Sequence, residues 1–205
     1  MMRMRLFLPR GLLAVLPALV LSTPAEAHIV ASRLGDFYAG ALHPLTGLVD
    51  VLLWAALGLL AGTQPPGRAR WLVPLFPLGL LVGLTLGLRG GVPEGAVLDA
   101  AMMVTVGGLL AAAARLPIPA LCALALGLGI WRGLANAAGV ASETNVALFA
   151  GGLVMAGYAA VTLASAAATA FLAPGQGWRG ITLRAAGSWI AAIGLMGGGL
   201  ALRPM

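Results

Sequence analysis

Residues 71–88 read WLVPLFPLGLLVGLTLGL, an apolar run without a charged side chain. A helix needs about 20 such residues to cross the hydrocarbon core of a bilayer. The runs are continuously apolar, whereas the strands of a membrane barrel alternate in polarity. Similar runs recur along the chain, so the sequence predicts an all-α polytopic bundle of about six transmembrane helices. Their expected ranges are 37–61, 71–88, 97–115, 118–137, 146–172 and 181–202.

The composition excludes a water-soluble fold. Hydrophobic residues make up 60% of the 205 positions and charged residues 9%, whereas an ordinary globular domain carries about a quarter charged residues. The basic residues are all arginines and lie singly between apolar runs, which favours topology signals over a nucleic-acid site. The single cysteine, Cys122, excludes an intrachain disulfide and a multi-cysteine metal site. We therefore expect the lipid bilayer as a partner, and no nucleic acid.

The first 27 residues have the three-part pattern of a secretory signal peptide. A basic leader at 1–10 precedes a short apolar run at 11–21, and an Ala-x-Ala arrangement ends at Ala27. We expect cleavage after Ala27, which leaves a six-helix domain at 28–205; the alternative is an uncleaved first helix. Cleavage would make His28 the N-terminal residue, and its amine and imidazole could then chelate a cation. An incidental histidine beside the cleavage site is the simpler alternative.

The charged residues predict an orientation. Signal cleavage places residue 28 outside, so six crossings put the loops at 62–70, 115–118 and 173–180 in the cytoplasm. These loops contain or adjoin five arginines and no acidic residue, which agrees with the positive-inside rule. We expect a bacterial inner (cytoplasmic) membrane protein with both mature termini on the periplasmic side.

Polar side chains at membrane depth are the first functional candidates, because a charge there costs about 2.5–3.5 kcal/mol on insertion scales. His43 and Asp50 lie in the first predicted helix, and their spacing of nearly two turns places them on one face. A proline and a glycine between them could kink that helix. Arg132 and Asn136 share a face of the fourth helix. Each of the two helices therefore presents a polar stripe.

The segment at 35–48, GDFYAGALHPLTGL, resembles the opening motif of the HupE/UreJ family, which comprises hydrogenase and urease accessory membrane proteins regarded as nickel or cobalt permeases. The resemblance extends over the signal peptide, a histidine at the mature N-terminus and six short helices. It implies transported Ni²⁺ or Co²⁺ and no resident cofactor. The residual metal ligands would be His43, Asp50 and Asn136, with His28 at the mouth.

The chain departs from the family at most of the expected histidines. The family pattern His-Pro-x-x-Gly-x-Asp-His keeps its first His, Pro and Gly here, but Val49 and Asp50 replace its final Asp-His. The His-Gly-x-x-His pattern of the fourth helix begins with Arg132 and ends with Asn136. Imidazole suits nickel and cobalt, whereas arginine has no lone pair to offer a metal ion. The metal chemistry of the family therefore transfers poorly.

These replacements suggest an ion pair in place of a metal site. If the two polar faces meet, Asp50 and Arg132 would satisfy each other's charge without a metal ion. Such a pair could simply hold the helices together, or it could belong to a gated transport path. Alternatively, Arg132 could extend towards the outer face, since it lies near a helix end.

Three functions compete on this sequence. The first is a divalent-cation permease for nickel or cobalt, and the second is a metal-free relative that carries another substrate or assists the assembly of other proteins. The third is an intramembrane serine protease, which would need a Gly-x-Ser-Gly motif. Ser165 and Ser188 have no such surroundings, so we do not expect an enzyme.

Two further patterns concern packing and the outer surface. The ridge of Gly79, Gly83 and Gly87, and similar i, i+4 pairs elsewhere, predict helices that approach closely. Polar residues on the outer side could form an acidic vestibule, although ordinary solvated loops are the simpler explanation; they are Asp36, Glu94, Asp99, Glu143 and Asn145.

Overall fold

The computed structural model describes residues 35–91, 95–175 and 177–203, and this part of the chain is helical without a strand. It confirms the all-α membrane bundle expected from the sequence. The predicted signal peptide and His28 lie outside the described residues. A helix at residues 35–42 leads into η1 (His43–Thr46), α3 (Leu48–Thr63), α4 (Pro66–Ala69), α5 (Leu72–Gly90), α6 (Ala96–Ala111), α7 (Ile118–Asn136), η2 (Ala137–Gly139), α8 (Val146–Leu172) and α9 (Gly177–Ala201).

Every predicted apolar run contains a helix, but the first run is broken. Residues 35–46 and α3 meet at a bend of 85°. Proline lacks a backbone N–H to continue a helix, and Pro44 stands at the start of η1. Gly47 then adopts an extended conformation with φ −102° and ψ 116°. The predicted helix at 37–61 is therefore two segments, either a broken span or a re-entrant loop.

The third run forms a shorter helix than expected. α6 ends at Ala111 rather than near 115, because the chain turns at Ala113, which has a positive φ of 51°. Its 16 residues rise about 24 Å, less than the roughly 30 Å of a hydrocarbon core. Among the described residues, four helices are long and apolar enough to cross a membrane, and the bent pair makes a fifth if it is one broken span.

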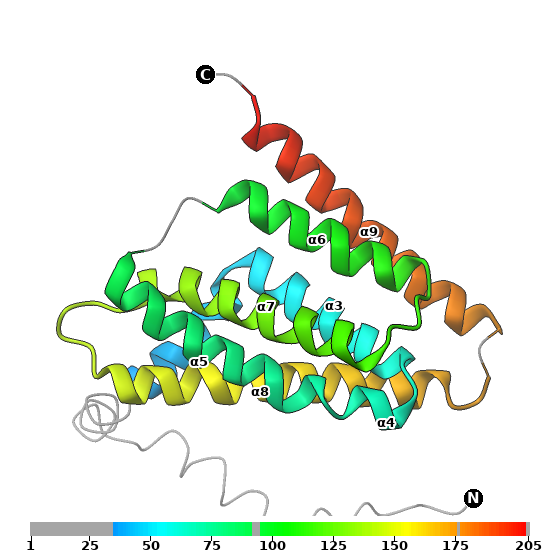
Figure 1. The fold of residues 1–205 in the computed structure, drawn as a ribbon, viewed down its shortest axis with the longest axis horizontal. Coiled ribbons are helices and arrows are strands. Elements are labelled where there is room, and N and C mark those ends of the chain that lie inside the picture. The colour runs from blue at the N-terminus through cyan, green and yellow to red at the C-terminus, as the bar shows by residue number, and fades with distance from the viewer. Residues whose placement is uncertain (1–34, 92–94, 176, 204–205) are drawn as a thin grey trace, which may run out of the picture. The chain divides into compact units, whose positions relative to one another are not determined.

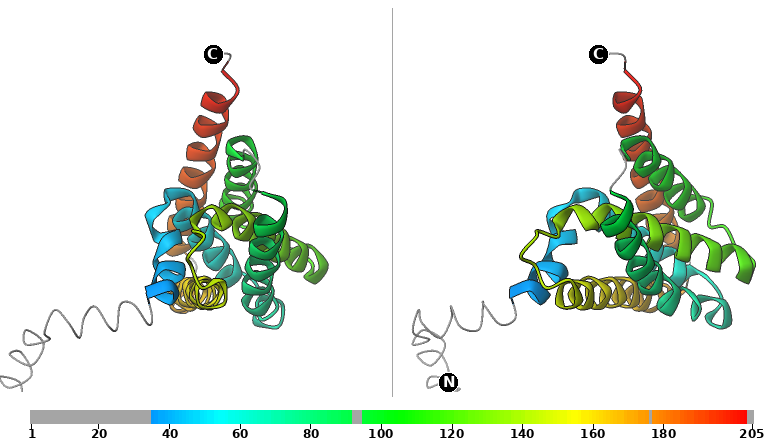
Figure 2. Two further views of the ribbon diagram at one scale, coloured as in Figure 1. Left: turned by 90° about the vertical axis from the view of Figure 1, so that its left-hand side faces the viewer. Right: turned by 60° about the vertical axis from the view of Figure 1, so that its left-hand side comes forward.

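The helices pack in pairs. α5 lies along α7, α6 lies along α9, and α3 packs on α8 and touches α6. Figure 1 shows α6 and α9 side by side above α3 and α7, with α5 and α8 below. The two views of Figure 2 keep α9 beside α6. α3 therefore lies between the α6–α9 pair and the helices α5, α7 and α8. Its polar residues can meet side chains from both sides.

Apolar side chains fill the interior and also cover much of the surface. The rings of Trp54 and Phe76 meet edge to face at 5.5 Å in the core between α3 and α5. At the same time many large apolar side chains of α8 and α9 are exposed, among them Leu163, Trp189 and Leu195. A surface of this kind suits a lipid solvent, in which exposed apolar groups carry no cost.

The predicted glycine ridges lie at the helix contacts, most closely between α5 and α7. A Cβ on Gly83 would collide with the backbone of Ile130, and a Cβ on Gly133 would collide with the backbone of Leu80. Gly79 and Gly129 face each other in the same seam. Only glycine permits backbones to come this close, so the pairing of α5 with α7 requires the glycines at these positions.

The arginine-bearing loops gather at one end of the bundle. The side chain of Gln64, after α3, donates to the carbonyl of Ala114 (2.8 Å) and accepts from the N–H of Leu116 (3.1 Å). Arg68 also donates to the carbonyl of Leu116, at 3.1 Å. Figure 1 shows the loop between α8 and α9 at the same right-hand end. We call this end, with Arg68, Arg70, Arg115, Arg179 and Arg184, the arginine end.

The opposite end carries the acidic side chains. The backbone N–H of Asn145 donates to Asp36 at 2.9 Å, and Ser142 donates to Glu143 at 2.8 Å. The latter hydrogen bond lowers the pKa of Glu143 from its ordinary value. We call this the acidic end. Asp36 thus links the first helix to the loop before α8, and Glu143 bonds within that loop, whereas Asp99 turns inward; Glu94 lies outside the described residues.

Candidate functional site

Among the described charged residues, Arg132 and Asp50 are the most deeply buried, at 7% and 5% exposed. Arg132 Nε donates to Asp50 Oδ1 at 2.7 Å, and its Nη2 donates to Oδ2 at 2.9 Å. This two-point contact matches the planar guanidinium to the planar carboxylate, which is the strong form of the pair. The structure therefore brings α7 and α3 together through these two residues, and Arg132 does not extend outward.

A second carboxylate completes the cluster from α6. Arg132 Nη1 donates to Asp99 Oδ1 at 2.5 Å, and the neighbouring indole of Trp131 donates to the same oxygen at 2.7 Å. The Trp131 ring also packs on Gly95, just before α6. One guanidinium thus binds a carboxylate on each of two other helices. We call Asp50, Asp99, Trp131, Arg132 and Asn136 the ion cluster.

Asn136 closes the cluster one turn after Arg132. Its Nδ2 lies 3.1 Å from Asp50 Oδ2 and 2.8 Å from the carbonyl of Arg132, so it donates to both. The residue is 2% exposed, and its Oδ1 is buried without a hydrogen-bond partner among the described residues. An unpaired buried acceptor costs about 1–3 kcal/mol. Asn136 is therefore the one member of the ion cluster with an unpaired buried hydrogen-bond acceptor among the described residues.

The backbone places both carboxylates at the helix end that favours a negative charge. Asp50 and Asp99 lie in the first turns of α3 and α6, while Arg132 lies in the last part of α7. The N-terminus of a helix carries a partial positive charge and its C-terminus a partial negative charge. Both carboxylates are therefore stabilised by their own helices as well as by the guanidinium of Arg132.

The cluster does not fit a metal ion. Two carboxylates and one guanidinium leave a formal charge of −1, but both oxygens of Asp50 already accept hydrogen bonds from Arg132. Arginine cannot ligate, and nickel or cobalt would prefer imidazole. In the described ranges, no group of three or more His, Cys, Asp or Glu side chains could hold a metal ion.

His43 lies apart from these contacts. Its imidazole packs against Gly139 of η2, and its centroid is 6.0 Å from that of Phe149 on α8. Of the metal ligands expected from the sequence, the structure brings Asp50 and Asn136 into one cluster and gives His43 an aromatic and backbone environment. The expected role of His28 lies outside the described residues.

Sequence reasoning missed Asp99 and Trp131. Asp99 was expected among the outer polar residues because it stands near the start of an apolar run, where a solvated residue is common. Trp131 precedes Arg132 directly and gave no signal beyond that adjacency. An acidic residue in the first turn of a membrane helix signals that a partner is needed, but the sequence does not say which helix supplies it.

Comparison with known proteins gives one match. The family model described as HupE / UreJ protein matches residues 16–196, which include all the helices of the ion cluster. No curated protein and no solved structure matches the chain. The family match spans most of the 205 residues and agrees with the motif at 35–48. The chain therefore belongs to the HupE/UreJ family.

Proposed function

We propose that the protein is a membrane accessory protein of the urease or hydrogenase kind, in which the ion cluster holds the helices together without a metal ion. Membership of the family supports an accessory or nickel/cobalt transport-related role. The observation that favours the accessory role is the two-point contact of Arg132 with Asp50. It occupies the carboxylate on which a cation path through α3 and α7 would depend.

The energetics favour a lasting pair over a transient one. Removing one partner of a buried ion pair leaves an uncompensated charge and costs about 3–5 kcal/mol. A cation that entered the cluster would have to displace Arg132 from Asp50 and from Asp99, and would leave the guanidinium without an acceptor. Binding of a cation would therefore have to offset the loss of all three hydrogen bonds that Arg132 donates to the two carboxylates.

The same proposal includes a place in the cell. We infer a bacterial inner membrane, with the arginine end in the cytoplasm and both mature termini in the periplasm. The gathering of five arginines and no acidic residue at one end supports this, because cytoplasmic loops carry an excess of arginine and lysine. The signal peptide at 1–27 would deliver the chain and be removed.

The second candidate is a nickel or cobalt permease with a reduced ligand set. The unpaired Oδ1 of Asn136 beside Asp50 favours it, since a buried acceptor of this kind could take part in binding a passing cation. His43 would then contribute an imidazole from the neighbouring segment.

The two candidates differ in how nickel affects a deletion strain. The gene would be deleted in a bacterium that encodes the protein and makes urease or hydrogenase, and enzyme activity would be assayed over a range of added nickel. The accessory role predicts an activity loss that excess nickel does not restore. Full restoration by nickel would favour the permease and contradict the proposal.

Measuring the uptake of metal ions in a second host is the complementary experiment. Cells that express the chain would be compared with an empty vector for radioactive nickel and cobalt uptake, beside His43→Ala, Asn136→Ala and the distant control Thr182→Ala. The proposal predicts uptake equal to the vector for every variant, with membrane insertion checked for each. Uptake that only the two site variants abolish would establish the permease.

A further inference from the structure

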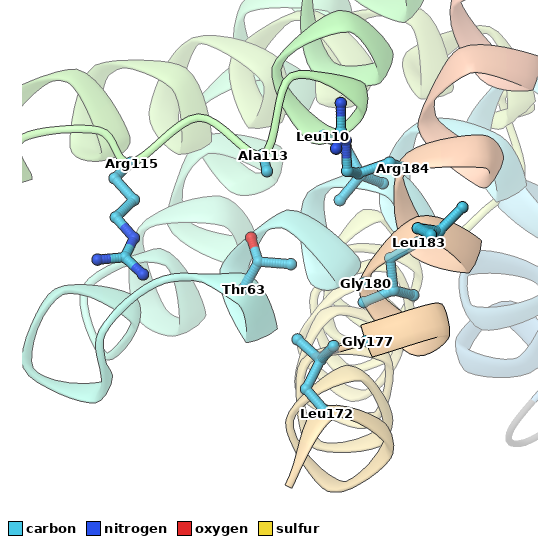
Figure 3. A pocket seen from close by; sticks show the side chains of 10 residues that line it. Thr63, Leu110, Ala113, Arg115, Leu172, Gly177, Gly180, Leu183 and Arg184 are labelled. Carbon is cyan, nitrogen blue, oxygen red and sulfur yellow. The ribbon is translucent and has the colours of Figure 1, made fainter. Parts of the chain in front are cut away.

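A second site lies at the arginine end, at the opposite ends of α3 and α6 from the carboxylates of the ion cluster. A cavity of about 230 Å³ opens between the ends of α3 and α6 and the start of α9, as Figure 3 shows. One water molecule takes about 30 Å³ in the liquid, so the cavity has room for several waters or for a phosphate group. It is lined by Thr63, Leu110, Ala113, Arg115, Leu172, Gly177, Gly180, Ile181, Leu183 and Arg184.

The cavity is positively charged. Arg115 and Arg184 stand on opposite sides of it in Figure 3, and none of the lining residues is acidic. Among the described residues, the only arginine with a carboxylate within salt-bridge distance is Arg132. No described carboxylate therefore neutralises the charges of Arg115 and Arg184, which leaves both available to an anion.

The backbone reinforces this charge. Arg184 Nε donates to the carbonyl of Ala111 at 2.9 Å, near the end of α6, which fixes the guanidinium against the cavity wall. The first turn of α9 supplies Gly177 and Gly180 to the lining. The first N–H groups of a helix have no partner within the helix and favour a negative charge.

The remaining walls and the surroundings indicate what kind of anion would fit. Leu110, Leu172, Ile181 and Leu183 make part of the lining apolar. Nearby, Trp178 is 64% exposed and stacks with Arg179, an arrangement typical of side chains at the level of lipid headgroups. A ligand with a phosphate head and an acyl chain would match both kinds of wall.

We propose that this cavity binds the phosphate of an anionic phospholipid from the leaflet at the arginine end. Basic pockets between membrane helices on the cytoplasmic side bind anionic headgroups in this way. The proposal does not depend on the function of the ion cluster. Lipid in this cavity would bridge α3, α6 and α9 where their connecting loops meet.

The experiment compares lipid binding to variants of the full chain in neutral detergent. Purified protein would be titrated with phosphatidylglycerol or phosphatidylcholine and examined by native mass spectrometry. The variants are Arg115→Gln and Arg184→Gln, beside the controls Arg70→Gln, at the same end but outside the cavity, and Arg203→Gln after α9. Each arginine contributes about 1 kcal/mol near an anionic surface, which is about fivefold in affinity.

We expect phosphatidylglycerol to bind more tightly than phosphatidylcholine, and each cavity variant to weaken it about fivefold while the controls bind as the native chain does. Equal effects in Arg70→Gln would overturn the proposal, because binding would then be general charge attraction. In a competition arm, loss of the bound lipid to millimolar inorganic phosphate would assign the cavity to free phosphate and overturn the lipid. If Arg184→Gln does not fold, Arg115→Gln carries the test, because Arg115 lines the same cavity with an exposed side chain.

Discussion

Arg132 is the residue on which the interior of this protein depends. Its guanidinium binds Asp50 at two points and Asp99 at a third, and its backbone carbonyl accepts from Asn136. A lysine could not reproduce this, because an ammonium is a point charge without the planar fork. A residue that departs from the family pattern thus binds partners on two other helices.

Substitution of Arg132 by methionine tests this dependence. The variant leaves Asp50 buried without a counter-charge, so we expect a loss of about 3–5 kcal/mol in the free energy of unfolding. Unfolding in detergent micelles, followed by circular dichroism, would measure it. The double variant Asp50→Leu with Arg132→Met should be destabilised less than Arg132→Met alone, since both charges are gone. Effects that simply add would show that the two side chains are not coupled.

The sequence allowed part of this cluster to be predicted. Two opposite charges on apolar helices need each other, so the meeting of Asp50 with Arg132 could be hypothesised from the residues alone. The place of Asp99 could not, because nothing in the sequence says that the first turn of α6 lies against α7. The bond from Trp131 depends on that same helix placement.

The seam of α5 and α7 shows how glycine sets the distance between helices. Without a hydrophobic drive in lipid, helices associate through close packing, and small residues permit it. Gly83 meets the backbone of Ile130 across the seam, and Gly133 meets that of Leu80. This close approach also fixes the position of Arg132 along the bundle, because Arg132 is next to Gly133.

Two glycines of α7 offer a matched test of the seam. Gly133→Ala places a methyl group on the backbone of Leu80, so we expect the free energy of unfolding to fall by about 1–3 kcal/mol. Gly127→Ala in the same helix has nothing within 4 Å of its new Cβ and should change stability by less than about 0.5 kcal/mol. Equal losses in the two variants would mean that the seam is not the cause.

The apolar runs predicted the positions of the helices, but they did not predict the bend in the first run or the end of α6. Hydropathy alone does not distinguish a straight helix from the bent pair at 35–46 and 48–63, because both halves are apolar. Pro44 and Gly47 did signal a kink. The early end of α6 at Ala111 had no signal, since the alanines that follow favour a helix just as much as those before them.

The distribution of charge distinguishes the two ends of the molecule and predicts its orientation in the membrane. The ends of α3, α6 and α8 and the start of α9 gather five arginines, while Asp36, Glu143 and the ion cluster lie towards the other end. The family match and the loop charges were accessible from the sequence. Which helix pairs with which was not, because all the faces are apolar and the glycine pairs are shared among several helices.

Cysteine labelling in spheroplasts tests the orientation of the protein in the membrane. In a Cys122→Ser background, Ser142→Cys at the acidic end should react with a membrane-impermeant maleimide from outside. Gly67→Cys at the arginine end should react only after lysis, because cytoplasmic loops are the arginine-rich ones. Labelling of Gly67→Cys in intact spheroplasts would reverse the orientation.

The most direct test of the metal-free cluster is the thermal stability of the purified chain with and without nickel. A ligand that binds only the folded state at a hundred times its Kd adds about 2.7 kcal/mol, which raises the melting temperature by several degrees. The protein, carrying no histidine tag, would be heated in detergent with increasing Ni²⁺ or Co²⁺, beside Asn136→Ala. We predict no change in melting temperature for either protein; a rise in the native chain that Asn136→Ala abolishes would contradict the account.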